Sequence, residues 1–134
     1  MKPLFAENDD VETVYCIFLN AKNKILAIEK MFSGTITASV MYPRELIKRA
    51  IALKSCAIVL SHNHPSGIVE PSDEDKEATI KTALALAFID VTLHDHIIIG
   101  EGGFYSMADW GWLNSVGKRF NDLFISWDQN SPAT

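Results

Sequence analysis

A short apolar run, CAIVL at residues 56–60, is followed almost at once by two histidines, His62 and His64. A continuous run of this kind is typical of a strand that is covered on both faces of a sheet. A Pro-Ser-Gly turn follows at residues 65–67, and from Ser72 apolar residues recur at helical spacing. These residues predict a strand, a turn and a helix, with the strand ending as the histidines begin.

The rest of the chain alternates between the two patterns. Short apolar or β-branched runs predict strands, whereas apolar residues at every third or fourth position predict helices. The mixture predicts an α/β layered domain with a mixed sheet. We expect strands at residues 14–19, 24–32, 35–41, 56–60, 90–99 and 104–107, and helices at 43–53 and from 72 onward.

Two features of the second half of the chain can be read from spacing alone. Residues 118–134 show no clear period, which predicts a partly disordered tail after a single domain at residues 1–117. The helix that begins near residue 72 carries apolar side chains on one face, which we expect to be the buried one: Ile80, Ala83, Leu84, Ala87 and Phe88.

Composition excludes several classes of protein. The 134 residues are 48% hydrophobic and 22% charged, as in an ordinary globular domain. A net charge of −5 disfavours nucleic acid as a partner, although Arg44, Lys48 and Arg49 could form a local basic patch. The acidic N-terminal segment does not resemble a signal peptide, and no apolar run reaches the roughly 18 residues of a membrane helix. We expect a cytoplasmic protein without a membrane partner.

The cysteines and two tryptophans have ordinary structural interpretations. Cys16 and Cys56 each lie in an apolar run, so two buried, reduced thiols are favoured over a disulfide or a reactive thiol. For Trp110 and Trp112, packing against the sheet is favoured over a role in partner binding.

The residues between 62 and 75 predict a metal site. His62 and His64 are two positions apart, so their side chains share one face of an extended strand, and Asp75 could add a third ligand. Two histidines and a carboxylate make a zinc site that keeps one position for water. The alternative is a capping box between Ser72 and Asp75. Capping does not account for the paired histidines, so the full spacing HxHx7SxxD favours the metal.

HxHx7SxxD is the signature of the JAMM (JAB/MPN) metalloprotease superfamily, and the stretch SHNHPSGIVEPSDED resembles its bacterial RadC-like branch. The segments VYCIFLNAKNKILA, GTITASVMYPRELIKRA and LHDHIIIG resemble that branch in order and spacing, so the similarity covers about residues 11–107. The resemblance implies a cytidine deaminase-like fold with three α/β/α layers and one bound Zn²⁺.

The resemblance also implies roles for individual residues. His62, His64 and Asp75 fall on the metal ligands, and Ser72 falls on the serine that stabilises an oxyanion. Zinc in such a site lowers the pKa of a bound water from about 16 towards 7.

The remaining catalytic group of the family is a glutamate on an early strand. Glu12 is the favoured general base, because it precedes an apolar strand as in the family, and Glu29 is the alternative. Asp95 and His96 match a family DH pair that would support the site, while ordinary hydrogen bonds on a strand remain an equal interpretation for them and for His94.

The favoured function is zinc-dependent hydrolysis of an amide or isopeptide bond in a peptide or protein substrate. The alternatives are a DNA repair or nucleic-acid maintenance module and a non-catalytic interaction domain. The first alternative is weakened because only about ten residues precede the first expected strand, where RadC-like proteins carry a helix-hairpin-helix segment. Asn63 agrees with the RadC-like branch but replaces the small hydroxyl residue of many JAMM proteases. A zinc deaminase would need a His-x-Glu and a PCxxC motif, which this chain lacks.

Overall fold

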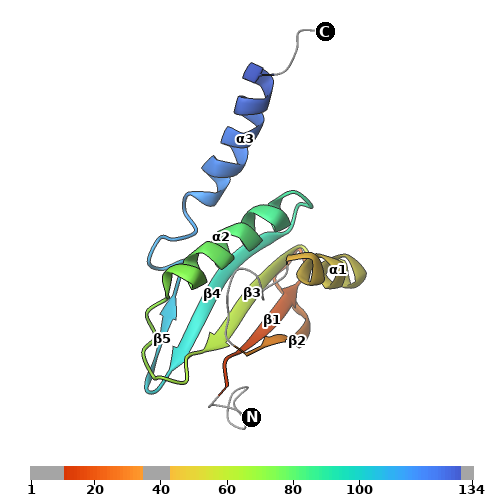
Figure 1. Cartoon of the computed structure of the whole chain (residues 1–134). Coiled ribbons are helices and arrows are strands. Elements are labelled where there is room, and N and C mark those ends of the chain that lie inside the picture. Colours follow the sequence, from red (N-terminus) through yellow and green to blue (C-terminus); the bar gives the residue numbers. More distant parts are fainter. Residues whose placement is uncertain (1–10, 35–42, 131–134) are drawn as a thin grey trace.

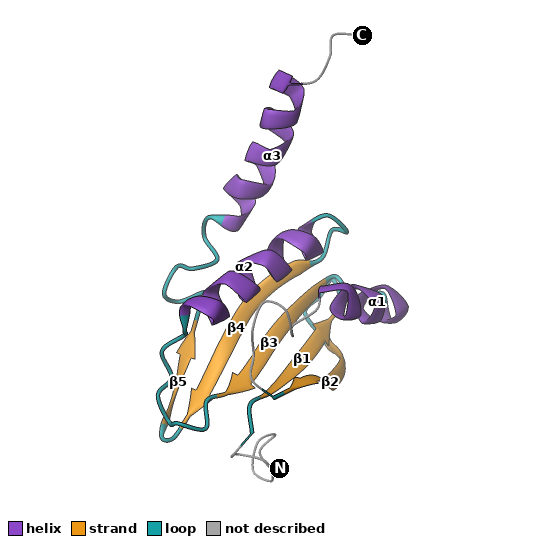
Figure 2. Cartoon of the chain, viewed as in Figure 1, coloured by secondary structure: helices purple, strands orange, loops and turns teal. Residues whose placement is uncertain are grey.

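The computed structural model describes residues 11–34 and 43–130, with the backbone alone for residues 125–130. The described residues form one five-stranded sheet in the order β2-β1-β3-β4-β5, together with three helices (Figures 1 and 2). The strand expected at residues 35–41 lies outside the described residues. The elements are β1 Thr13–Leu19, β2 Ile25–Ser33, α1 Pro43–Leu53, β3 Ala57–Asn63, α2 Asp73–Ala87, β4 Thr92–Gly100, β5 Gly103–Ser106 and α3 Val116–Asn130.

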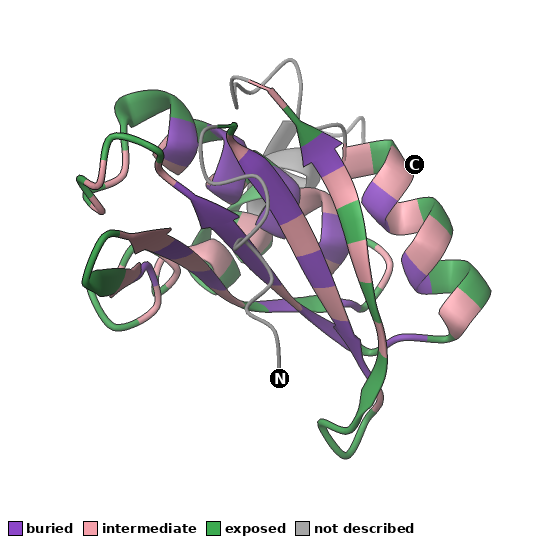
Figure 3. Ribbon diagram, turned by 90° about the horizontal axis from the view of Figure 1, so that it is seen from below, coloured by how far each residue is buried: buried purple, intermediate pink, exposed green. Residues whose placement is uncertain are grey.

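The α/β class and the mixed sheet are confirmed. Strands β3 and β4 are parallel, as expected for a pair joined through a helix, and the other neighbours are antiparallel. Strand β3 is the middle strand of the sheet and β1 is its inner neighbour, and Figure 3 colours the ribbon by burial. The continuous apolar runs of the sequence correspond to these inner strands because both of their faces are covered or half-covered.

One face of the sheet carries the main hydrophobic core. On β1 the core side chains are Val14, Cys16 and Phe18, all fully buried, and they oppose His62, Leu60 and Ile58 of β3. Helices α1 and α2 contact each other and both add side chains to this same core. Of the three expected layers, the described residues therefore show the sheet and one helical layer.

Strand β3 continues further than its apolar run predicts. It runs through Asn63, so His62 lies inside the strand and His64 follows it. Val14 of β1 and Ile98 of β4 are the register partners of His62, one on each side. The expected end before the histidines was wrong because strand pairing uses backbone groups and is indifferent to the change from apolar to polar side chains.

The buried face of α2 matches the expected one only at Ala83. Phe88, at the C-cap of α2, is 56% exposed, and its ring lies 4.9 Å from that of Phe120. The core face is made of small and polar side chains, because these allow α2 to approach the sheet closely and face the histidines. Its buried residues are Asp75, Ala78, Thr79, Thr82, Ala83 and Leu86.

The C-terminal region is helical where the sequence predicted a frayed tail. Helix α3 covers Val116–Asn130, and residues 131–134 lie outside the described part. It contacts α2 alone among the described elements and projects away from the sheet (Figure 1). Phe120 and Phe124 pack against Phe88, and Val116 packs against the hydrophobic core, which together explain why the helix is held here. No helix within the described residues has both the length and the hydropathy needed to cross a bilayer.

The two tryptophans lie at the surface, so the expectation of core packing was wrong. Trp110 is 70% exposed and stacks on Tyr105 with a centroid distance of 5.4 Å. Trp112 donates its indole N–H to the Tyr105 hydroxyl at 2.7 Å, and Lys76 lies 4.1 Å above its ring. These contacts hold the segment after β5 against α2.

The two cysteines also differ from each other. Cys16 is fully buried, as expected, whereas Cys56 is exposed because it precedes the first residue of β3. Burial raises the pKa of the Cys16 thiol, which disfavours the reactive thiolate.

We therefore expect a thiol reagent to modify one cysteine in the native protein and two after unfolding in denaturant. The absorbance of the released chromophore measures the number of modified cysteines before and after unfolding. A Cys56→Ser variant should give no reaction before unfolding. Two equivalents from the native wild type would contradict the buried position of Cys16.

Candidate metal centre

Three side chains converge where β3 ends and α2 begins. The Nε2 atom of His64 lies 3.1 Å from Oδ2 of Asp75, and Nε2 of His62 lies 3.6 Å from Oδ1 of the same carboxylate. Ligands about 2.0–2.1 Å from a tetrahedral zinc are separated by about 3.3 Å. Both separations are close to this value, so they are compatible with ligands of one ion, and the structure brings together the residues that the motif predicted.

His62 provides the test of whether a metal fits. Its side chain is completely buried, and Nε2 has no hydrogen-bond partner among the described residues. Its other ring nitrogen, Nδ1, lies 2.6 Å from Nε2 of His96. A buried polar atom without a partner is costly in an ordinary core, whereas a ligand nitrogen needs that free lone pair. The donor set fits a metal ion.

His64 is held by the loop that follows β3. Its Nδ1 lies 2.8 Å from the carbonyl oxygen of Ile68, which fixes Nδ1 as the donor in the neutral ring and leaves Nε2 for a metal. The loop turns at Gly67, whose φ of +84° favours glycine. A Cβ on Gly100 would lie 2.5 Å from the Gly67 carbonyl oxygen, so glycine at the end of β4 permits the loop to pack there.

The capping box and the metal cluster coexist. The Ser72 hydroxyl accepts from the Asp75 backbone N–H at 3.0 Å, and Asp75 Oδ2 accepts from the Ser72 N–H at 2.9 Å. The carboxylate that caps α2 is thereby aimed at the two histidines. The capping box is therefore present, and it leaves the carboxylate in a position that is compatible with the ligand interpretation.

Glu12 lies beside the histidines, just before β1. Ligand atoms of Glu12, His62 and His64 are all within 4.8 Å of one another. The buried Asn63 side chain accepts from Thr13 N–H at 2.7 Å and donates to the Val11 carbonyl oxygen at 2.8 Å. Asn63 thus holds the backbone on both sides of Glu12, a role that could not be read from the sequence.

Glu29, the alternative base, is engaged elsewhere. Its two carboxylate oxygens accept from Nε and Nη2 of Arg49 at 2.7 and 2.6 Å. These hydrogen bonds lower the pKa of Glu29. Glu29 pairs with a helix α1 residue, and the geometry supports Glu12 as the residue at the cluster.

The residues of the LHDH segment separate into three environments. His96 is buried and contacts His62, whereas the Asp95 carboxylate accepts from Ser106 at 2.5 Å and from Ala108 N–H at 2.9 Å. Asp95 Oδ1 also accepts from the backbone N–H of His96 at 2.7 Å, so Asp95 supports the turn after β5 and the backbone of His96. His94 is exposed and lies 3.0 Å from the Asn23 side chain, an ordinary surface hydrogen bond.

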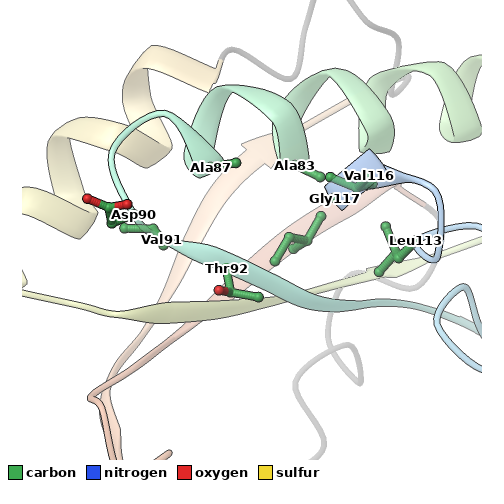
Figure 4. A pocket seen from close by; sticks show the side chains of 9 residues that line it. Ala83, Ala87, Asp90, Val91, Thr92, Leu113, Val116 and Gly117 are labelled. Atoms are coloured by element: carbon green, nitrogen blue, oxygen red, sulfur yellow. The ribbon is translucent and has the colours of Figure 1, made fainter. Parts of the chain in front are cut away.

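An open cleft of about 500 Å³ reaches the cluster. Its lining includes Glu12, His64, Ser72 and Asp75, so a substrate in the cleft would meet the proposed catalytic groups. A second pocket, of about 390 Å³, lies between the end of α2, the start of β4 and the start of α3 (Figure 4). Its lining is mostly Ala, Val and Leu with Asp90 at one side, which indicates a gap in packing at the end of α2 remote from the cluster.

Burial and charge set the protonation of the cluster. Burial lowers the pKa of His62 to about 4 and that of His96 well below 6.5, so both rings are neutral at pH 7. The hydrogen bond with Asp75 raises the pKa of His64. Burial acts to raise the pKa of Asp75, but the bonds with His64 and Ser72 outweigh it and lower the value to about 2.

These shifts predict acid destabilisation of the metal-free protein. A buried histidine with a lowered pKa contributes stability above its unfolded value of 6.5, and the contribution is lost as the pH falls towards the folded value. For His62 the loss between pH 6.5 and 4 is on the order of 3 kcal/mol. His64, with its raised pKa, offsets part of it. Urea unfolding at pH 7, 6 and 5 measures the change, and a His62→Gln variant should show a flatter profile; equal stability at pH 7 and 5 in the wild type would refute the assignment.

The fold and the cluster define a class: an α/β domain with a histidine pair, an aspartate and a glutamate at the end of an inner strand. The family model of the RadC-like JAB domain matches residues 1–112, and the chain belongs to that family. UPF0758 proteins are among its curated relatives. That of Stutzerimonas stutzeri is 49% identical over 98 residues, 73% of this chain and 44% of the relative.

Two further UPF0758 proteins show the same extent of similarity. That of Azotobacter vinelandii is 48% identical over 102 residues, covering 76% of this chain and 46% of the relative. That of Thiobacillus denitrificans is 44% identical over 110 residues, covering 82% and 49%. The chain thus spans about half the length of the curated relatives it matches.

Proposed function

We propose that this domain is a zinc-dependent hydrolase that cleaves an amide or isopeptide bond in a peptide or protein substrate. The observation that carries the proposal is the convergence of two histidine Nε2 atoms and the Asp75 carboxylate beside a cleft that also exposes Glu12 and Ser72. His62, His64 and Asp75 would hold the ion. When bound, zinc would act as a Lewis acid that makes a nucleophilic water available at neutral pH.

Glu12 would move the proton. Its carboxylate lies at the histidine cluster, whereas the carboxylate that contacts both imidazole rings is that of Asp75. Glu12 would therefore take a proton from the attacking water. It would then deliver that proton to the leaving amine nitrogen. The hold of Asn63 on residues 11 and 13 would keep the carboxylate in place during both transfers.

Ser72 would stabilise the negative charge that develops on the carbonyl oxygen. Its hydroxyl oxygen already accepts a hydrogen bond from the Asp75 N–H, which leaves the hydroxyl proton available for donation. Ser72 also lines the cleft, so the donor faces the space where a substrate carbonyl would lie. A preorganised donor of this kind contributes to transition-state stabilisation.

A peptide substrate is favoured over nucleic acid by the charges around the site. Acidic side chains line the cleft (Glu12, Glu70, Glu74 and Asp75), and no Lys or Arg of the described residues lines it. Of the possible basic patch, Arg49 is neutralised by Glu29, and Arg44 and Lys48 lie 3.9 and 4.0 Å from Glu45. Neither the exposed tryptophans nor the acidic side chains of the cleft can supply the contacts to phosphate that nucleic-acid binding needs. The activity would operate in the cytoplasm, which two free cysteines favour.

Metal analysis followed by hydrolysis assays tests the proposal. We expect one zinc per chain at neutral pH, and cleavage of members of a peptide and isopeptide library that disappears on chelation and returns with added zinc. A wild-type protein that stays metal-free when zinc is supplied would overturn the proposal. Bound zinc without cleavage would support a non-catalytic interaction domain, and salt-sensitive DNA binding would support nucleic-acid maintenance.

A further inference from the structure

A buried chain of hydrogen bonds lies behind the histidine cluster. Nδ1 of His62 is 2.6 Å from Nε2 of His96, and Nδ1 of His96 is 2.6 Å from the Thr79 hydroxyl. That hydroxyl donates to the backbone carbonyl oxygen of Asp75 at 2.6 Å. The side chains of His62, His96 and Thr79 are fully buried. The chain therefore begins at one proposed ligand and ends at the backbone of another.

The protons along this chain of hydrogen bonds can be arranged in only two orders, and in each order all the bonds point in the same direction along the chain. A neutral imidazole has one N–H and one lone pair, so in a bond between two rings the proton position on one ring dictates that on the other. His64 differs, because its Nδ1 faces a carbonyl oxygen that can only accept. His62 faces a second imidazole, which could either donate or accept. Its tautomer is thus decided at the far end of the chain, by Thr79.

In the first order every bond is satisfied. The Thr79 hydroxyl donates to the Asp75 carbonyl oxygen and accepts from the His96 Nδ1–H. The lone pair on His96 Nε2 then accepts from the His62 Nδ1–H. His62 is left with a lone pair on Nε2, the atom that has no hydrogen-bond partner.

The reverse order leaves a buried donor unpaired. If the Thr79 hydroxyl turned to His96, the His96 Nε2–H would donate to His62 Nδ1, and His62 would carry its proton on Nε2. The nearest carboxylate oxygen, Asp75 Oδ1, is 3.6 Å away, beyond a good hydrogen bond. Unpaired buried N–H groups are rarer in proteins than acceptors with a free lone pair. The first order is therefore favoured even without a metal.

We propose that Thr79 is a positioning residue for the metal centre, because it sets the direction of this chain through His96 and so fixes the His62 tautomer whose Nε2 lone pair faces the site. That this lone pair binds a metal ion rests on the proposed function, whereas the direction of the hydrogen bonds from His62 to Thr79 does not. Thr79 holds the chain from α2, the same helix that supplies Asp75, so one element orients two ligands. No sequence motif marked this residue.

Nitrogen NMR of the histidines in the metal-free wild type tests the direction at once. We expect the Nε2 atoms of His62 and His96 to have the shifts of unprotonated nitrogens and both Nδ1 atoms those of N–H groups. The opposite pattern on either ring would overturn the proposal. This measurement needs neither zinc nor activity, so a failure of the proposed function would be seen separately in the metal analysis.

A pair of threonine variants tests the consequence for zinc. Thr79→Val removes the hydroxyl at nearly constant volume, and we expect zinc affinity to fall about 10- to 100-fold, the usual cost of losing a group that orients a ligand. Thr82→Val is the matched control, because Thr82 lies on the same helix, is equally buried, and its hydroxyl has no hydrogen-bond partner among the described residues. Thr79→Ser should restore the affinity.

Competition with a chelator measures the zinc affinities. An unchanged affinity in the Thr79→Val variant, or an equal loss in the Thr82→Val variant, would overturn the positioning role. If the Thr79→Val protein does not fold, the wild-type NMR pattern alone decides the direction. In a folded Thr79→Val protein the same spectra should show a mixture of the two neutral His62 tautomers, one protonated on Nδ1 and the other on Nε2.

Discussion

A Glu12→Gln variant is expected to keep its zinc and lose hydrolysis. Glutamine occupies the same space and can keep the backbone bonds that Asn63 makes around residue 12, but it cannot accept the proton of the attacking water. Loss of a general base costs typically about 10²- to 10⁴-fold in rate. The measurement is turnover of a cleaved library peptide at saturating zinc, with metal content determined on the same sample.

Glu29→Gln is the matched control for this experiment. The same chemical change on β2 breaks the bidentate pair with Arg49, so we expect unchanged turnover and a small loss of thermal stability. The pair of variants separates the two glutamates that the sequence left open. Full activity in the Glu12 variant, or loss of activity confined to the Glu29 variant, would exclude Glu12 as the base.

Replacement of both His62 and His64 by alanine should reduce the zinc content from one equivalent to none. The double change removes two of the three proposed ligands. Each removal should lower the zinc affinity by more than the roughly 10- to 100-fold that follows the loss of a group hydrogen-bonded to a ligand. Metal analysis after dialysis against buffer with trace zinc measures the result. Circular dichroism should show a folded protein, since neither histidine belongs to the hydrophobic core cluster that the sheet shares with α1 and α2.

His94→Ala serves as the histidine control. His94 lies on the same strand as His96 but is exposed and bonded to Asn23, so its loss should leave one zinc per chain. Zinc retained by the His62, His64 double variant would place the ion elsewhere. Zinc lost equally in the His94 variant would show that the assay reports folding and not the site.

Local sequence patterns predicted much of the fold because they record which residues are apolar and how they are spaced. The helix at residues 43–53 and the sheet of mixed direction followed from these patterns. The errors arise where tertiary contacts outweigh local pattern. Strand β3 continues through polar residues because its neighbours pair with it, and α3 is stabilised by a contact with Phe88 that no local period could reveal.

By itself, the sequence determined that His62, His64, Ser72 and Asp75 would lie near one another, because a strand, a tight turn and a capped helix leave them little room to separate. Only the tertiary structure decided which distant residues join them. It brought Glu12 to the cluster through Asn63, sent Glu29 to Arg49, and placed His96 and Thr79 behind His62. These contacts join residues far apart in the chain, and they depend on strand register and helix packing, which local spacing does not encode.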